Sequence, residues 1–459
     1  KALKNAAMLA QAILVRAFVS SSWCRFAKLN LFVAASRCNI MAQVRINVAF
    51  GFAGRKAAIT ANSAWVLQDI LAHVSSRDAN ASCVWNRAFF GAAELAGQST
   101  LGDLGVADGD VLTLVASPLP PVLTTGIAGE AKLWNATSGE CLHVLAGQRG
   151  VYSSAFSPGG LVVATASLDA TVKVWGVASG ECLATLRGHT GCVFSVAFSP
   201  DGQAVVTASG DATVKTWSAS TGECHCTFQG PDKGMNSAVF SPDGQSIAAT
   251  SADGTARILC TSSAQCLRTL LGHRGSVSSP AFSPDGHVLA TASSDNTARL
   301  WDVSSGQCLW TLRGHSSFVK SIAFSPSGQS VVTASGDGTA KIWSTSSGAC
   351  LRTLWASGAD AKSKATSAQF SPDGRAVVTA TTNGAARIWA TDSGRCLRTL
   401  STCPRGVDST KFSPDGRAVV TASRDGQVRV WGVGSGECWC VLESSDRADV
   451  VLAAFAPSW

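Results

Sequence analysis

Histidine, serine and aspartate recur together at three places in the chain, and these residue types can form a catalytic triad. In such a triad the aspartate orients the histidine, which removes the proton of a nucleophilic serine. A tryptophan follows each set at the same distance. Because the group repeats along the chain, its spacing favours a structural role over one active site. The sets are His189, Ser209, Asp211 and Trp217; His273, Ser293, Asp295 and Trp301; and His315, Ser335, Asp337 and Trp343.

The 16 cysteines offer a second kind of chemistry, as metal ligands or disulfides. Two close pairs, Cys224/Cys226 and Cys438/Cys440, lack a second pair at zinc-ligand spacing. We therefore expect no metal site and no cofactor. Equivalent positions in neighbouring repeats lie too far apart to bridge, which predicts buried free thiols in a reducing compartment. One column of the repeat holds Cys141, Cys182, Cys224, Cys266, Cys308, Cys350, Cys396 and Cys438.

No other segment collects groups that could act together on a substrate. Residues 51–56 contain two glycines before Arg55 and Lys56 but lack the spacing of a phosphate-binding loop. The sequence therefore predicts that the protein is not an enzyme and takes no small-molecule substrate.

The elements that position these residues come from a repeat whose marker is Phe-Ser-Pro. Most of the markers are 42 residues apart, and each repeat contains four short β-branched runs separated by turn residues. A four-stranded unit of this length predicts one blade of a β-propeller. The markers begin at Phe156, Phe198, Phe240, Phe282, Phe324, Phe370 and Phe412, and a degenerate copy contains Phe455.

Over about three quarters of its length the chain resembles WD-repeat proteins. Its repeats have Gly-His before the first strand, Asp in the turn after the second and Trp near the end of the third. The resemblance implies that the His, Ser, Asp and Trp sets are buried structural tetrads. The third-strand tryptophans are Trp134, Trp175, Trp217, Trp301, Trp343, Trp389 and Trp431, with Leu259 as the exception.

The repeat count predicts a mainly β fold with an eight-bladed propeller over residues 122–459. Trp134 has no Phe-Ser-Pro strand before it, and the strand that ends at Phe455 has no blade after it. We therefore expect the C-terminal strand, residues 450–456, to complete the first blade and remove an open edge. Seven blades is the alternative.

Residues 41–116 differ from the repeats and resemble a small α+β domain of the ubiquitin-like β-grasp family. The pattern predicts a strand at 42–48, a helix over 66–74 and a closing strand at 109–115. The resemblance implies a docking face that includes Phe89, Thr113 and Val115. Residues 117–121 form a linker.

The positive charge is concentrated at the N-terminus. Net charge is +7, and residues 1–40 contain six basic residues and no acid. The remainder is nearly neutral, so we expect no direct nucleic-acid binding. Residues 1–40 fit a basic leader or disordered extension, or else a transit peptide that directs the protein to an organelle. Otherwise the protein is expected in the cytoplasm or nucleus. No segment predicts a membrane span.

Two variable columns in an otherwise constant repeat indicate where partners bind. By resemblance to WD-repeat propellers they lie at the top rim of the central channel, and a fixed scaffold with a variable rim suits a binding surface. Unconstrained drift is the alternative. An insertion places Trp355 on the same face as a candidate anchor. The candidates are Tyr152, Phe194, Asn236, Phe318, Lys320, Lys364, Asp408 and Trp355.

These features together predict a non-catalytic scaffold or adaptor for other proteins, within a multi-subunit complex. The propeller top face and the ubiquitin-like domain would dock separate partners. Two narrower alternatives remain open. One is a large-ribosomal-subunit assembly factor resembling the Notchless family, which joins these two domain types. The other is a substrate adaptor of the ubiquitin pathway.

Overall fold

The computed structural model divides the chain into two compact units, Lys1–Leu119 and Pro120–Trp459. It describes residues 27–33, 43–50, 55–62, 85–90, 93–94, 110–116, 119–126, 131–148, 150–263, 265–358, 363–401, 405–443 and 450–457. Within these residues no helix is long and apolar enough to cross a membrane.

The N-terminal unit contains one six-stranded sheet, in the order β3-β2-β1-β6-β4-β5. Strand β1 pairs antiparallel with both β2 and β6, although it comes from the segment that we expected to be a leader. The expected helix over 66–74 lies outside the described residues, and the β-grasp assignment stays a prediction. The strands are β1 (Ala27–Val33), β2 (Gln43–Phe50), β3 (Arg55–Asn62), β4 (Trp85–Phe90), β5 (Ala93–Glu94) and β6 (Asp110–Ala116).

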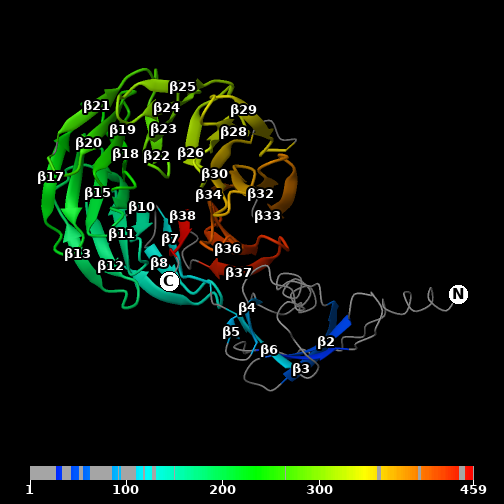
Figure 1. Ribbon diagram of the computed structural model, residues 1–459. Coiled ribbons are helices and arrows are strands. Elements are labelled where there is room, and N and C mark those ends of the chain that lie inside the picture. Colours follow the sequence, from blue (N-terminus) through cyan, green and yellow to red (C-terminus); the bar gives the residue numbers. More distant parts are fainter. Residues whose placement is uncertain are drawn as a thin grey trace. The chain divides into compact units, whose positions relative to one another are not determined.

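The second unit is a propeller of eight four-stranded antiparallel sheets, or blades, arranged around a central channel (Figure 1). Blade 1 contains β10 (Val151–Phe156), β11 (Val162–Ser167), β12 (Val172–Gly176) and β13 (Cys182–Leu186), and blade 2 contains β14 (Val193–Phe198), β15 (Ala204–Ser209), β16 (Thr213–Ser218) and β17 (Cys224–Gln229). Blade 3 contains β18 (Met235–Phe240), β19 (Ser246–Ser251), β20 (Ala256–Cys260) and β21 (Cys266–Leu270). Blade 4 contains β22 (Val277–Phe282), β23 (Val288–Ser293), β24 (Ala298–Asp302) and β25 (Cys308–Leu312).

Blades 5 to 7 continue the same order, and blade 8 combines strands from both ends of the propeller. Blade 5 contains β26 (Val319–Phe324), β27 (Ser330–Ser335), β28 (Ala340–Ser344) and β29 (Cys350–Leu354), and blade 6 contains β30 (Ala365–Phe370), β31 (Ala376–Thr381), β32 (Ala385–Ala390) and β33 (Cys396–Ser401). Blade 7 contains β34 (Val407–Phe412), β35 (Ala418–Ser423), β36 (Gln427–Gly432) and β37 (Cys438–Glu443). Blade 8 contains β38 (Val450–Phe455), β7 (Val122–Gly126), β8 (Ala131–Trp134) and β9 (Cys141–Leu145).

The eight-blade prediction is therefore confirmed, and blade 8 explains how the ring closes. Strand β38 pairs antiparallel with β7, so that Phe455 lies opposite Val122 and Ala453 opposite Thr124. Phe455 and Ala456 are buried. The first strand of blade 8 thus comes from one end of the propeller sequence and its other three strands come from the other.

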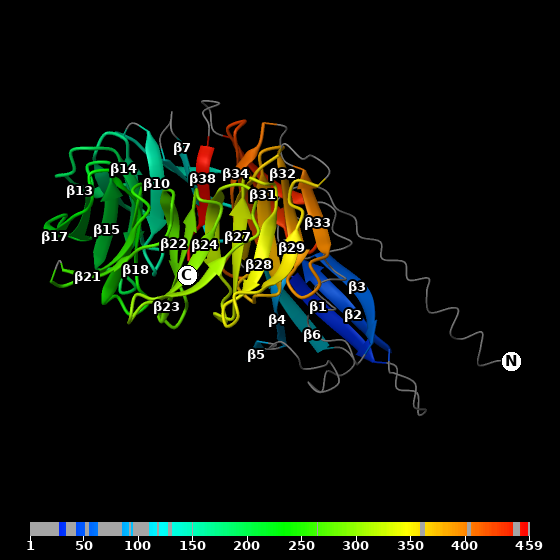
Figure 2. The same ribbon diagram turned by 90° about the horizontal axis from the view of Figure 1, so that it is seen from above.

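The Phe-Ser-Pro marker forms the turn between the first and second strands of a blade. In blade 2 the Ser199 hydroxyl donates to the Asp201 carboxylate and accepts a hydrogen bond from the Ala204 amide. Gly202 adopts a left-handed φ of +72°, which glycine tolerates best. Figure 2 views the ring from its side, with the strands running between its two faces. The markers therefore gather on one face, and the loops before the first strands gather on the other.

A chain of hydrogen bonds braces the tryptophan of blade 2, although its composition differs from our expectation. Trp217 Nε1 donates to Thr207 Oγ1 at 2.9 Å, and the Thr207 hydroxyl lies 2.7 Å from His189 Nε2. His189 Nδ1 lies 2.9 Å from the Asp211 carboxylate. Ser209 lies beside this chain, where its hydroxyl donates to the Gly191 carbonyl. The threonine two residues before the serine is therefore the bridging residue.

The same arrangement occurs in blades 4 and 5. His273 contacts Thr291 and Asp295, and His315 contacts Thr333 and Asp337. Trp301 and Trp343 donate to these threonines. Ser293 and Ser335 again donate to backbone carbonyls instead.

Blade 1 builds the same chain with a glutamine that the sequence analysis overlooked. Gln148 occupies the histidine position, where its Oε1 accepts from Thr165 and its Nε2 donates to Thr171. Trp175 donates to Thr165, as its counterpart does in blade 2. Gly147-Gln148 in place of Gly-His was the available signal. The network therefore needs an acceptor toward threonine and a donor on the opposite side, which neutral histidine and glutamine both provide.

We expect acid to weaken the histidine version of this network. Burial lowers the pKa of His189 and His273, although their aspartate partners oppose the shift. As the pH falls below about 6.5, the ordinary pKa of histidine, the unfolded chain therefore binds protons before the folded protein does. The free energy of unfolding consequently decreases as the pH decreases. Burial raises the pKa of Asp211, but hydrogen bonds from Thr213, Thr190 and His189 outweigh it and lower that pKa. Stability from Asp211 is likewise lost toward lower pH.

The variant His189→Gln copies blade 1 and tests this account. Its melting temperature should fall less than that of the wild-type protein between about pH 7 and pH 5. Thermal melts followed by circular dichroism at both pH values measure the difference. Equal losses in the two proteins would contradict the assignment of His189 as a neutral, acid-sensitive member of the chain.

The fourth-strand cysteines are exposed, so the expectation of buried thiols was wrong. This strand forms the outer edge of each blade, and all eight cysteines of the column lie on it as free thiols. In blade 2 the Cys224 thiol donates to the Cys226 carbonyl of its own strand. The edge strand covers the blade with its leucine or phenylalanine near the end, such as Leu186 or Phe228, while the cysteine faces outward.

We therefore predict that the native protein reacts readily with a thiol reagent. Iodoacetamide should modify the eight cysteines of this column without denaturant, because they are exposed and unbridged. Peptide mass spectrometry before and after addition of guanidinium measures the modified fraction at each site. Protection of the column until the protein unfolds would contradict its placement on the outer edge.

Candidate functional site

A bulge in the first strand of most blades directs the variable residue toward the rim of the channel. In blade 2, Val193 pairs with Ser209 and Ser195 pairs with Ala208, so Phe194 between them is the extra residue. A bulge re-aims a side chain without disturbing the rest of the ladder. The same shift occurs at Tyr152, Asn236, Lys320, Thr366, Asp408 and Val451.

Blade 4 departs from this geometry because of a proline. In β22 the register shifts between Ser278 and Ala281, and Ser279 has a φ of +50°. Pro280 lies within this shift and cannot donate a backbone hydrogen bond. Strand β22 pairs with β23 alone, so the proline lies in an edge strand, where it is tolerated.

Aromatic rings from blades 1 and 2 form the first part of the rim. Tyr152 and Phe194 meet edge to face, with ring centroids 5.6 Å apart. A Cβ atom on Gly210 would lie 3.2 Å from the Phe194 ring, so the glycine makes room for it. Tyr152 is exposed, and this pair offers an aromatic surface held in a fixed orientation.

A cation and an aromatic ring combine on blades 5 and 6. Lys364 Nζ lies 5.4 Å from the centre of the Phe318 ring, a cation–π contact. The Phe318 ring rests on Gly336, where an added Cβ atom would come within 2.6 Å of it. The two residues come from the second variable column, and the structure brings them together across the blade boundary.

Charged residues of blades 5 and 7 continue the rim. The Arg424 guanidinium donates two hydrogen bonds to the Asp408 carboxylate, at 2.8 and 2.9 Å. Burial lowers the pKa of Lys320, with Asp408 raising it and Arg424 lowering it further. Lys320 is therefore within electrostatic reach of this ion pair. The rim here presents both signs of charge.

Two residues of the first variable column, the predicted rim residue Asn236 and its counterpart Thr366 in blade 6, form hydrogen bonds within the propeller. Asn236 donates to Ser276 and to the Val277 carbonyl of the next blade, at 2.9 and 2.7 Å. Thr366 is buried and donates to the Val407 carbonyl at 2.7 Å. Both residues brace neighbouring first strands, so they contribute less to an exposed surface than the other candidates.

Trp355 lies on an anchored loop and is 65% exposed. The next residue, Ala356, is fully buried, and its carbonyl accepts a hydrogen bond from Arg387. The Ser357 amide donates to the Gly338 carbonyl at 3.0 Å. The tryptophan therefore extends into solvent from a backbone that is fixed on its C-terminal side.

Sequence reasoning missed Arg424, which belongs to a third variable column. This column follows the serine or threonine that ends each second strand and reads Leu168, Gly210, Ala252, Ser294, Gly336, Thr382 and Arg424. The backbone amide of a residue in this column donates to the carbonyl of the residue two positions before the bulge, as Arg424 does to the Gly406 carbonyl. Glycine here accompanies a rim phenylalanine, and arginine accompanies a rim aspartate. That pairing of columns was the signal.

The predicted docking face of the N-terminal unit is described through its backbone. Phe89 pairs directly with Thr113, and Arg87 pairs with Val115. The strands that hold these positions, β4 and β6, are neighbours in the sheet. Whether this face binds a partner stays a prediction.

The eight radial sheets, each with a tryptophan or leucine near the end of its third strand, define a β-propeller of repeated blades. The family described as "WD domain, G-beta repeat" matches more than half of the chain. The chain therefore belongs to the WD40 family. The matched segments are residues 139–176, 180–218, 222–259, 264–302, 306–344, 348–390 and 394–432.

Each matched segment begins at the outer strand of one blade and ends at the third strand of the next. An eighth copy would consist of β37, β38, β7 and β8, which come from opposite ends of the propeller sequence. A search along the chain finds seven copies, and the three-dimensional structure supplies the eighth.

A designed protein is similar to this one. The crystal structure of the computationally designed Ika8 protein aligns with a TM-score of 0.61 and 27% sequence identity, covering 69% of this chain and 95% of the designed one. A comparison with curated proteins found no significant match.

Proposed function

We propose that this protein is a non-catalytic scaffold that binds a protein partner through one arc of the propeller rim. WD40 propellers are typically interaction scaffolds of this kind. The rim patch, as we name it, consists of Phe318, Lys320, Trp355, Lys364 and Asp408. Its support is the contrast between a constant scaffold and variable residues on blades 5 to 7, of which Trp355 and Lys364 are exposed and Phe318 and Lys364 contact each other.

The composition of the rim patch indicates the chemistry of its partner. Trp355 supplies a large exposed apolar surface, and tryptophan is enriched among residues that dominate binding energy. Lys320 and Lys364 add positive charge, while Asp408 is already paired with Arg424. A protein segment with an apolar pocket flanked by acidic side chains would complement this patch.

Two variants of matched chemistry test the proposal by affinity capture from the source cells. Trp355→Ala should lose most of the bound partner, because removal of a binding anchor costs about 2 kcal/mol or more. Trp310→Ala is the control, since Trp310 is also exposed but lies on the outer strand β25. Equal recovery of every partner with both variants would refute a role for the rim patch.

The identity of the captured proteins distinguishes the narrower functions. A large-subunit assembly factor of the Notchless type would recover pre-ribosomal particles, whereas a ubiquitin-pathway adaptor would recover ligase or proteasome subunits. The combination of a separate N-terminal sheet unit with an eight-bladed propeller supports the first. Deletion of residues 1–119 then shows which partners need the N-terminal unit.

A further inference from the structure

The channel wall contains a second irregularity, near the Phe-Ser-Pro face. The residue before each marker phenylalanine is small and apolar in six blades: Ala155, Ala197, Val239, Ala281, Ala323 and Ala454. In blades 6 and 7 it is Gln369 and Lys411. Two polar side chains therefore replace small apolar ones in neighbouring blades of an otherwise uniform ring.

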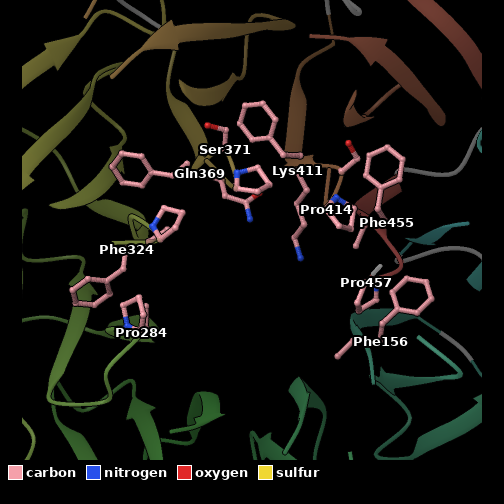
Figure 3. A pocket seen from close by; sticks show the side chains of 18 of the residues that line it. Phe156, Pro284, Phe324, Gln369, Ser371, Lys411, Pro414, Phe455 and Pro457 are labelled. Carbon is pink, nitrogen blue, oxygen red and sulfur yellow. The ribbon is translucent and has the colours of Figure 1, made fainter. Parts of the chain in front are cut away.

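Both side chains line a cavity within the channel. Its volume is about 790 Å³, within the range of roughly 300–1,000 Å³ that small-molecule sites occupy. Figure 3 shows Gln369 and Lys411 extending from neighbouring inner strands toward the middle of the channel. Phenylalanines and prolines of the markers form much of the remaining wall, including Phe324, Phe455 and Pro284.

Neither polar group has a partner among the described residues. Lys411 makes no hydrogen bond or ion pair with those residues, and burial alone lowers its pKa. Gln369 Oε1 is buried without a hydrogen-bond donor. The marker serines Ser371 and Ser413 do not balance the lysine, because a hydroxyl carries no charge and both already donate to a turn aspartate and accept from a backbone amide.

An unpaired lysine in a mostly apolar cavity destabilises the empty protein, as does a buried acceptor without a donor. A bound anion would pair with Lys411, and a hydroxyl or N–H group on it would satisfy Gln369. A single lysine suits one negative charge, whereas a phosphate dianion would be left half neutralised. The phenylalanine and proline walls suit an apolar body.

We propose that this cavity binds a small organic monoanion, a carboxylate on an aromatic or hydrocarbon body that also has a hydrogen-bond donor. The carboxylate would pair with Lys411 and the donor with Gln369. This site is separate from the rim patch, which belongs to the opposite ends of the first strands.

Calorimetric titration of the full chain with hydroxynaphthoate tests the proposal, with hydroxynaphthamide as the uncharged probe. Lys411→Ala restores the alanine of other blades, so the variant should fold. It should bind hydroxynaphthoate about tenfold or more weakly, as expected for loss of a charged hydrogen bond. Gln369→Ala should bind hydroxynaphthoate and unsubstituted naphthoate equally, whereas the wild-type protein should prefer the hydroxylated probe.

Lys320→Ala, which removes a lysine of the rim, is the matched control and should bind as the wild type does. Without ligand, Lys411→Ala should melt at the same temperature as the wild type or higher. Three results would overturn the proposal: no binding of hydroxynaphthoate to the wild-type protein, equal binding by Lys411→Ala, or equal affinity for the acid and the amide.

Discussion

Deletion of residues 450–457 is expected to unfold the entire propeller and not merely blade 8. Strand β38 pairs along the length of β7, and Phe455 at its end is buried together with the next residue, Ala456. Loss of a buried phenylalanine alone costs about 3–5 kcal/mol. The lost strand pairing adds to this, and the total approaches the roughly 5–15 kcal/mol that stabilises a typical protein. Blade 8 also closes the ring between blades 7 and 1.

Chemical denaturation followed by tryptophan fluorescence measures the effect. Phe455→Ala should lower the free energy of unfolding by a few kcal/mol, and Phe455→Leu, which keeps most of the volume, by about 1 kcal/mol. A synthetic peptide of residues 450–457 should restore the truncated protein. An unchanged melting curve after truncation would contradict the shared blade.

Thr207→Val should strongly destabilise blade 2, although it nearly preserves the side-chain volume. The hydroxyl of Thr207 accepts from Trp217 and lies at hydrogen-bond distance from His189, and all three side chains are buried. Valine fills nearly the same volume but leaves two buried polar groups without a partner. Each such group costs about 1–3 kcal/mol, so the loss from the two groups should reach about 2–6 kcal/mol.

Thr250→Val provides the matched control, because blade 3 has the threonine without the tryptophan. Leu259 stands at the tryptophan position, and among the described residues Thr250 makes one long hydrogen bond, 3.4 Å to the Ser237 carbonyl. The change should therefore cost about 1 kcal/mol or less. Urea titrations of both variants give the two values. If the losses were equal, the hydroxyl of Thr207 would have no special role.

The repeat made the propeller predictable from sequence. The Phe-Ser-Pro spacing located every blade, and the unpaired strands at Trp134 and Phe455 indicated closure. These features depend on local turn chemistry and strand periodicity, which a single sequence displays directly. The variable column was also visible, because copies within one chain can be compared with one another.

What could not be predicted depends on contacts between blades and on side-chain direction. Thr207 and Ser209 share one face of the second strand, and Thr207 is the bridging residue because it lies within the ladder, opposite Lys215, whereas Ser209 ends the strand. The outward direction of the cysteines likewise follows from the edge position of the fourth strand. Arg424, Gln369 and Lys411 gain significance only when neighbouring blades are brought together.

The central claim, that the rim patch is the surface for a protein partner, is tested most directly by hydrogen–deuterium exchange. The experiment compares the free protein with the complex purified by affinity capture. We predict slower exchange in the loops around Trp355 and Lys364 and at the starts of β26 and β34, with little change in the Phe-Ser-Pro turns. Protection confined to those turns or to the outer strands, with the rim unchanged, would contradict the claim.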